Sequence, residues 1–242
     1  DSTKTLQALF ENVDLGHFNF LLSPYNSYMG GKLSGEVVVR NIRGKPFLES
    51  RLRANEINLN GTPLGQLRMD NKYSASEEKL TIDAEALYTH KNASYRPIAL
   101  KGSYFPFRKE NNMDLRLTSE NFSLTTFEPL ARSVFPMLRG FITASLQLRG
   151  SPARPEISGR VKLTRAEFRV AFINTSYSIT DEINITPTAF IINNLAINDS
   201  LGNKAICSGR ISHTWLRDFN FDLKIKPEKF LLFNNDPLQN PL

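Results

Sequence analysis

The most regular feature of this chain is a strict alternation of apolar and polar residues. From Ile142 to Arg149 every second side chain is apolar, and the same period returns from Ile157 to Leu163 and again up to Phe172. A period of two is typical of half-buried β-strands with one apolar face. We predict that this face is lined by Ile142, Ala144, Leu146, Leu148, Ile157, Val161, Leu163, Phe168, Val170, Phe172, Ile183, Ile185, Ile211, Phe219, Phe221 and Leu223.

Short turn sequences separate these runs, for example Gly61-Thr62-Pro63 and Ser151-Pro152. Strands joined by short turns pair antiparallel with their neighbours, which predicts a meander. One helix is expected over residues 127–135, capped by Thr125 or Thr126. Its apolar stripe would be Phe127, Leu130 and Val134, and Pro129 is compatible with the first turn.

The chain also resembles itself at a nearly constant spacing in sequence. Glycine, arginine and proline positions of 31–46 recur at 140–155, and the apolar residues of the strand after each recur as well. Glu11-Asn12 matches Glu120-Asn121 at the same offset, whereas Asp114-Leu115-Arg116-Leu117 matches 222–225 at an offset shorter by one position. A constant offset across several structural elements indicates two tandem repeats and the first strand of a third.

Two arrangements are compatible with strands that are apolar on one side: a sandwich of two sheets, or one sheet that curls over its apolar face. The predicted helical stretches are too short to cover such a sheet, and the tandem repeat favours one continuous sheet. We therefore expect an all-β fold, a long antiparallel meander sheet curled into an open, taco-like groove with short helices between repeats. A groove not filled by side chains would hold an apolar ligand.

Composition excludes several classes of function. The 242 residues are 40% hydrophobic and 22% charged with a formal net charge of +6 that is not clustered, as in a folded protein without a nucleic-acid-binding arm. Aromatic residues and basic residues occupy opposite phases of the strands, so no stacking platform for nucleic acid is expected. No apolar run is long enough to cross a bilayer, and the first residues do not form a signal peptide.

Catalytic and metal-binding motifs are absent from the sequence, so we expect neither enzymatic activity nor a cofactor. The single cysteine, Cys207, shares its phase with small apolar residues and is predicted to be a buried hydrophobe. His213 is expected to be a turn residue with satisfied hydrogen bonds. The segment Asp199–Asn203 is similar to a calcium loop but lacks the ligand spacing, so a hairpin turn is predicted.

The run Gly140–Leu163, GFITASLQLRGSPARPEISGRVKL, resembles the strand–hairpin–strand unit of the AsmA-like/TamB family. The segments 175–179, 194–203 and 208–213 are similar to the C-terminal domain of that family in its Bacteroidota form. The resemblance covers most of residues 15–233 and is strongest after Phe127. The first repeat departs from it, because Asn41 and Ser50 stand where the second repeat has glycine.

This resemblance implies a segment of a large periplasmic protein of a Gram-negative bacterium, anchored in the inner membrane by a part outside this chain. Its domains would be the end strand of a preceding repeat (1–14), a first groove repeat (15–123), a second (124–232) and a linker (233–242). It further implies that phospholipid acyl chains lie in the groove on their way between the two membranes, supporting outer-membrane biogenesis.

Two alternatives stay open. One is a scaffold for the translocation and assembly of outer-membrane proteins with an Omp85-type (TamA-like) barrel partner, in which a sheet edge pairs with client strands. The other is a β-sandwich interaction module.

Overall fold

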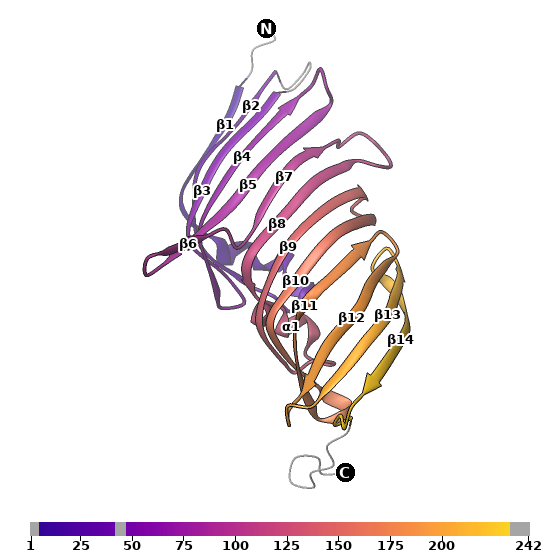
Figure 1. The fold of residues 1–242 in the computed structure, drawn as a ribbon. Helices are drawn as coiled ribbons and strands as arrows, with labels where there is room; N and C mark the ends of the chain where they lie inside the picture. The colour runs from indigo at the N-terminus through magenta and orange to yellow at the C-terminus, as the bar shows by residue number, and fades with distance from the viewer. Residues whose placement is uncertain (1–4, 42–46, 233–242) are drawn as a thin grey trace. The chain divides into compact units, whose positions relative to one another are not determined.

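The computed structural model describes residues 5–41 and 47–232, and the predicted linker 233–242 therefore lies outside the described residues. The chain is all-β and forms one 14-stranded antiparallel meander that is not closed (Figure 1). Each strand is hydrogen-bonded to the next along the chain, except for the short β6, which pairs only with β5. The predicted antiparallel meander is confirmed, and the strands form one hydrogen-bonded sheet, not the two separate sheets of a sandwich.

The strands vary in length, and the longest coincide with the runs of strictest alternation. They are β1 (Thr5–Asp14), β2 (Met29–Arg40), β3 (Phe47–Leu59), β4 (Thr62–Ser74), β5 (Lys79–His90), β6 (Ala93–Tyr95), β7 (Ala99–Tyr104), β8 (Met113–Ser123), β9 (Met137–Ser151), β10 (Arg154–Val170), β11 (Thr175–Thr186), β12 (Ala189–Asp199), β13 (Lys204–Thr214) and β14 (Arg217–Pro227).

The helical segments are short. They are the 3-10 turns η1 (Leu15–Leu21), η2 (Ser23–Tyr25), η3 (Leu124–Phe127) and η4 (Ala171–Ile173), and one α-helical turn, α1 (Glu128–Ala131). The helix predicted over 127–135 is thus shorter than expected, and Leu130 and Val134 are exposed instead of forming a buried stripe. Thr126 is almost fully buried, and Thr125 donates to the carbonyl of Leu138 instead of capping the helix. In the described residues no helix has the length and apolar character needed to cross a membrane.

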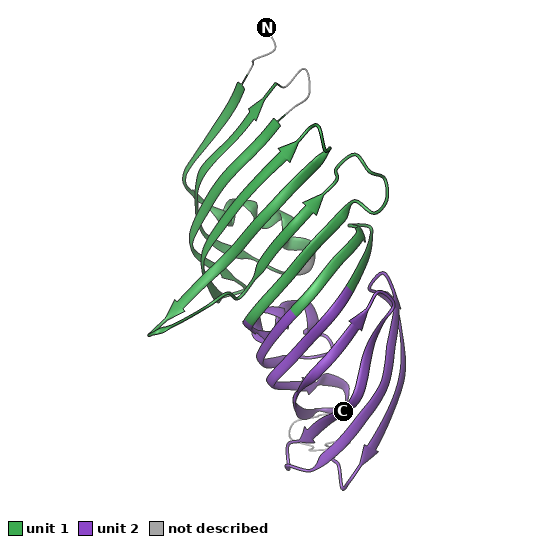
Figure 2. Ribbon diagram, turned by 45° about the horizontal axis from the view of Figure 1, so that its top comes forward, with its two compact units in different colours: residues 1–120, 145–157 green, residues 121–144, 158–242 purple. Residues whose placement is uncertain are grey.

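The chain divides into two compact units (Figure 2). Unit 1 contains residues 1–120 and 145–157, and unit 2 contains residues 121–144 and 158–242. The division crosses β9 and β10, whereas the repeats predicted at 15–123 and 124–232 follow the order of the sequence.

Several strands contain a β-bulge at a residue with a left-handed backbone. Asn12 in β1, Glu56 in β3, Asn121 in β8, Arg165 in β10 and Asn194 in β12 have φ between 47° and 55°. The pairing register shifts at these positions in β1, β3, β10 and β12. A bulge adds one residue to its strand, so the side chains beyond it change face. This explains why the apolar phase passes from odd positions before Thr164 to even positions after it.

The repeat seen in the sequence recurs in these backbone features. The spacing between Asn12 and Asn121 equals the spacing between Glu56 and Arg165. Gly31 and Gly140 are separated by the same number of positions. The helical turns η1 and η3, which begin at Leu15 and Leu124, are separated by the same interval. These two bulges and the helical connection therefore recur at a constant interval, whereas the bulge at Asn194 has no counterpart at Glu85 in the first repeat.

Candidate functional site: the apolar face of the sheet

In unit 1 the apolar face continues from strand to strand, because the strands pair in a register that places apolar residues opposite one another. Most of these side chains are half-buried, and Ala54 and Ala86 are each 1% exposed. One row of cross-strand partners is Gly35, Leu52, Met69, Ala84, Leu100 and Leu117, and a neighbouring row is Leu33, Ala54, Leu67 and Ala86.

One polar pair interrupts this face. Asn71 lies opposite Ser50 in the register of β3 and β4, and its amide donates to the Ser50 hydroxyl at 3.1 Å. Ser50 is buried at 5% exposure. The side-chain oxygen of Asn71 is buried and makes no hydrogen bond within the described residues. The face in unit 1 therefore carries buried polar groups among its apolar side chains, since Ser119, in the phase of Leu115 and Leu117 in β8, is also buried at 7% exposure.

The opposite face of unit 1 is covered by charged residues. Arg68 lies at the centre, with its guanidinium 3.0 Å from Asp70, 3.1 Å from Asp83 and 3.2 Å from Glu85. The attraction of Asp83, followed by that of Glu85 and Asp70, raises the pKa of Arg68 above its ordinary value against the opposing effect of burial. A hydrogen bond from Arg53 at 2.8 Å is the main reason that the pKa of Asp70 is lowered.

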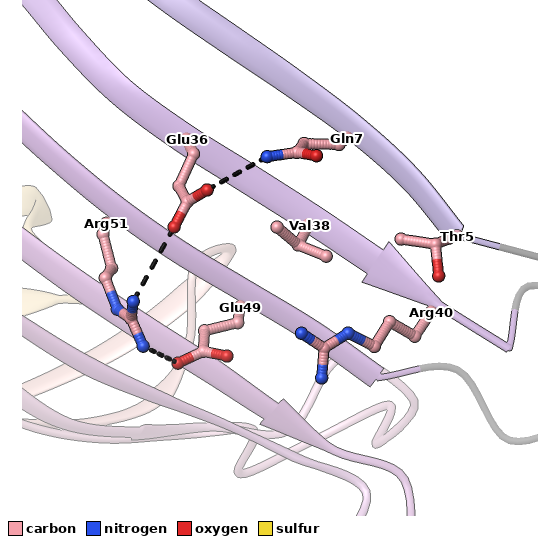
Figure 3. Close-up of a pocket in the computed structure, with 7 residues that line it drawn as sticks. All are labelled: Thr5, Gln7, Glu36, Val38, Arg40, Glu49 and Arg51. Atoms are coloured by element: carbon pink, nitrogen blue, oxygen red, sulfur yellow. Dashed lines mark hydrogen bonds and ion pairs between the residues drawn. The ribbon is translucent and has the colours of Figure 1, made fainter.

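This charged face also contains a hollow of about 220 Å³ (Figure 3). Arg51 lies between Glu36 and Glu49, with nitrogen–oxygen distances of 3.7 and 2.9 Å, and Gln7 donates to Glu36 at 3.2 Å. The lining residues are Thr5, Gln7, Glu36, Val38, Arg40, Glu49 and Arg51. Because most of them are polar or charged, the hollow does not suit an acyl chain and is separate from the apolar face.

Unit 2 has a hydrophobic cluster on the apolar face of its own strands. Four buried residues form its centre, namely Ile179, Ile192, Leu195 and Cys207, and each is at most 9% exposed. The half-buried side chains packed against them are Leu163, Phe168, Ile183, Ile197 and Ile211. Cys207 is 3% exposed, which confirms the prediction of a buried hydrophobe, and this burial raises the pKa of its thiol.

Aromatic side chains border this cluster. The ring of Phe168 lies 5.6 Å from that of Phe135 and 5.8 Å from that of Tyr177, and Tyr177 stacks on Phe230 at 5.2 Å. The Tyr177 hydroxyl donates to the Leu231 carbonyl at 3.0 Å. Burial raises the pKa of Tyr177, so the hydroxyl keeps its donor proton over a wider pH range. The segment after β14 is thereby held against the apolar side of β11.

Asp199 provides the second anchor for this segment. Its carboxylate accepts hydrogen bonds from the Leu231 N–H at 2.8 Å, from the Leu201 N–H at 2.9 Å, and from the backbone and side chain of Asn203 at 2.8 and 3.0 Å. Burial works against ionisation, but these hydrogen bonds outweigh it, so the pKa of Asp199 is lowered. Both oxygens are occupied by N–H donors, and the predicted hairpin turn is confirmed at residues 199–203.

Among the described residues no group of His, Cys, Asp and Glu side chains is arranged to hold a metal ion. His213 lies inside β13 and is buried at 6% exposure, so its assignment to a turn is wrong. Its Nδ1 accepts from the Leu216 N–H at 3.2 Å, and its ring lies 5.2 Å from that of Phe190. The buried Nε2 has no hydrogen-bond partner within the described residues, so only one of the two ring nitrogens has the expected hydrogen bond.

The predicted lining residues fall into four groups. Within unit 2, Leu163, Phe168, Ile183 and Ile211 pack in the hydrophobic cluster. Phe172 is in η4, not in a strand, and is 77% exposed, because β10 ends at Val170. Phe219, Phe221 and Leu223 lie on the edge strand β14 and are 48%, 65% and 36% exposed. Ala144 is buried, and those that are half-buried in their strands are Ile142, Leu146, Leu148, Ile157, Val161, Val170 and Ile185.

Sequence reasoning missed the apolar face on strands β1–β8 of unit 1 and, at the centre of the cluster in unit 2, Ile179, Ile192 and Leu195. In β12, Ile192 and Leu195 have opposite phases, which the bulge at Asn194 brings onto the same face. In β3, Ala54 and Ile57 are separated by the bulge at Glu56 in the same way. The recurring Glu-Asn pair at 11–12 and 120–121 is the sequence feature that could have located the bulges in β1 and β8.

Known proteins add no assignment to this geometry. None of the family models, curated proteins or solved structures compared with this chain matches it.

Proposed function

We propose that this chain is a periplasmic segment of an inner-membrane-anchored lipid-carrying protein of the AsmA-like/TamB kind, whose apolar sheet face holds phospholipid acyl chains. The observation that carries the proposal is the separation of the two faces in unit 1. In β2 to β5 the rows of cross-strand partners on one face are mainly apolar, while the alternate residues form a charged network.

A face of this kind suits a flexible apolar chain. Apolar surface is stabilised by removal from water at roughly 25 cal/mol per Å², whatever the detailed shape of the ligand. Rows such as Leu33, Ala54, Leu67 and Ala86 offer continuous contact without a defined pocket. Binding would therefore depend on the continuity of the rows and on no single residue, and the proposal assigns no catalytic step.

Charge on the other face supports the same function. Ion pairs such as Arg68–Asp83 keep that side of the sheet in water. Lipid would then bind on one side only, with its headgroup at the margin of the apolar rows. In the second compact unit the half-buried side chains packed around Leu195 would provide the corresponding apolar surface.

The direct test is extraction and mass spectrometry of lipids from the purified chain, together with transfer of a fluorescent phospholipid between liposomes. A Leu146→Asp variant places a carboxylate in the apolar phase of β9 and should abolish both bound lipid and transfer. Ser145→Asp adds the same charge to the neighbouring exposed position and should leave both intact. Circular dichroism establishes that both variants are folded. Full lipid binding and transfer by folded Leu146→Asp protein would refute the proposal.

A further inference from the structure

Three short segments of the chain share a sequence pattern and an unusual backbone conformation. They are Glu11-Asn12-Val13, Glu120-Asn121-Phe122 and Glu228-Lys229-Phe230, and their middle residues have φ of 50°, 49° and 50°. Other turns and bulges of the chain have the same angle, so it is the preceding glutamate and the offsets of 109 and 108 positions (121 − 12 and 229 − 121) that mark the three as equivalent. The segments lie at the ends of β1 and β8 and directly after β14. Strand β14 is therefore the third member of the series that begins with β1 and β8.

In the first two segments the N–H of the middle residue donates a hydrogen bond to a hydroxyl of the following strand. The N–H of Asn12 donates to Ser34 in β2 at 3.0 Å, and the N–H of Asn121 donates to Thr143 in β9 at 3.4 Å. Both hydroxyl residues come 22 positions after their bulge. Among the described residues, no hydroxyl takes this place for Lys229, because β14 pairs only with β13.

Exposure of equivalent residues shows what β14 lacks. Leu115 in β8 is 7% exposed, whereas its counterpart Leu223 in β14 is 36% exposed. Every residue of β14 is exposed, including Phe221 at 65% and Ile225 at 44%. These apolar side chains continue the apolar face, since Phe221 is opposite Ile211 and Ile225 is opposite Cys207. An apolar edge of this kind is a template for a further strand.

The charges on β14 define the partner further. Asp114 of β8, the counterpart of Asp222, receives Gln147 of β9 at 2.6 Å and Arg149 at 3.6 Å. These two residues come after the Thr143 hydroxyl by four and six positions. A strand that reproduced this spacing would place an amide and a guanidinium beside Asp222.

We propose that β14 binds an antiparallel β-strand from outside residues 1–242, one that alternates apolar and polar residues and carries a Ser or Thr facing the Lys229 N–H. A basic residue six positions after that hydroxyl would pair with Asp222. The proposal concerns the edge of the sheet and does not depend on lipid carriage by its face. Main-chain hydrogen bonds would supply the binding, and the hydroxyl and the basic residue would set the register.

The test uses the chain of residues 1–242 and a fluorescent peptide with the sequence of β9, MLRGFITASLQLRGS. We expect saturable one-to-one binding by fluorescence anisotropy. Two N-methylated peptides distinguish strand pairing from non-specific apolar adsorption. One is methylated on the odd-numbered residues and the other on the even-numbered residues. One phase should abolish binding and the other should retain it, because only one edge of the peptide faces β14. Equal behaviour of the two phases would overturn the proposal.

Two further measurements identify the site. A Thr143→Val peptide should bind roughly three- to tenfold more weakly than the original, the effect of one hydrogen bond, while Thr143→Ser should bind normally. A chain with Asp222→Lys should bind the original peptide more weakly than the unchanged chain does. It should bind an Arg149→Asp peptide more tightly than the unchanged chain does. Hydrogen exchange should slow in β14 and not in the other edge strand, β1. Slowing in β1 alone, or binding unaffected by Thr143→Val and by the charge exchange, would contradict the assignment.

Discussion

The backbone N–H of Arg165 donates to the hydroxyl of Thr180 across β10 and β11, at a distance of 3.0 Å. Arg165 has φ of 47°, and the strand register shifts around it. The same arrangement joins Asn194 to Ser208 at 3.0 Å in β12 and β13. At both of these bulges a hydroxyl on the neighbouring strand thus satisfies the N–H that the bulge removes from the regular ladder.

Replacing this hydroxyl should destabilise unit 2. Thr180→Val keeps the shape of the side chain and leaves the Arg165 N–H without its acceptor, so we expect a loss of about 1 kcal/mol in the free energy of unfolding. Thr180→Ser keeps the acceptor and should lose less. Urea denaturation of both variants checks the prediction, and equal losses would show that the hydroxyl is not what matters.

Glycine is required where one of these bulges approaches the neighbouring strand. A Cβ on Gly140 would lie 2.1 Å from the carbonyl oxygen of Arg165, and the residue has φ of +95°. We expect Gly140→Ala to cost roughly 3 kcal/mol or more, since steric overlap adds to backbone strain. At Gly202 φ is +83° and no atom lies within 4 Å, so Gly202→Ala should cost only about 1 kcal/mol. Thermal unfolding of the two variants measures the difference.

The charged face of unit 1 should contribute stability that depends on pH. The pKa of Asp70 is lowered in the folded state, chiefly by its hydrogen bond from Arg53, so its contribution is present above the unfolded pKa of about 3.9. It is lost as the pH falls through the lower folded value. Asp70→Asn should therefore destabilise the protein at pH 7 by at most about 1 kcal/mol, because solvent screens partly exposed pairs. Urea unfolding should show the wild type and the variant converging near pH 2; a constant difference would contradict this origin.

Anchoring of the segment after β14 should depend on Tyr177. Tyr177→Phe removes the hydroxyl that donates to the Leu231 carbonyl and keeps the ring that stacks on Phe230. We expect a loss of about 1 kcal/mol in the free energy of unfolding and faster hydrogen exchange at residues 230–232. Tyr28→Phe at an exposed tyrosine is the control and should change neither.

The cluster of unit 2 and the edge strand should respond differently to truncation. Leu195 is 3% exposed, and Leu195→Ala should cost roughly 2–4 kcal/mol, because the side chain leaves a cavity. Phe221 is 65% exposed, and Phe221→Ala should cost less than about 1 kcal/mol. Comparable losses at the two positions would mean that β14 is covered in solution.

Much of this fold follows from alternation alone, as the long strands β9 and β10 illustrate. Sequence reasoning found Leu163 and Phe168 on one face although their phases differ, but it had no physical reason for the change until the bulge at Arg165 was known. It extended β10 to Phe172, because an apolar residue in a 3-10 turn continues the alternation by coincidence.

Other features depend on contacts that local patterns do not encode. The bonds of Tyr177 and Asp199 to Leu231 join residues 54 and 32 positions apart. The apolar rows of unit 1 are interrupted by Ser50, Asn71 and glycines, so their composition does not identify them. The network around Arg68 required the pairing register, since sequence shows its charges but not which of them are neighbours.

Hydroxyl-capped bulges also have a consequence for how quickly this sheet can form. They join residues that are close along the chain, 22 apart for Asn12 and Ser34, 15 for Arg165 and Thr180, and 14 for Asn194 and Ser208. Closing such short loops takes much less than a millisecond, and all-β proteins fold slowly mainly because they must pair distant segments. A meander whose register is set between adjacent strands avoids that search. Each strand can pair with the strand before it as soon as that strand has formed, so the sheet can grow one strand at a time.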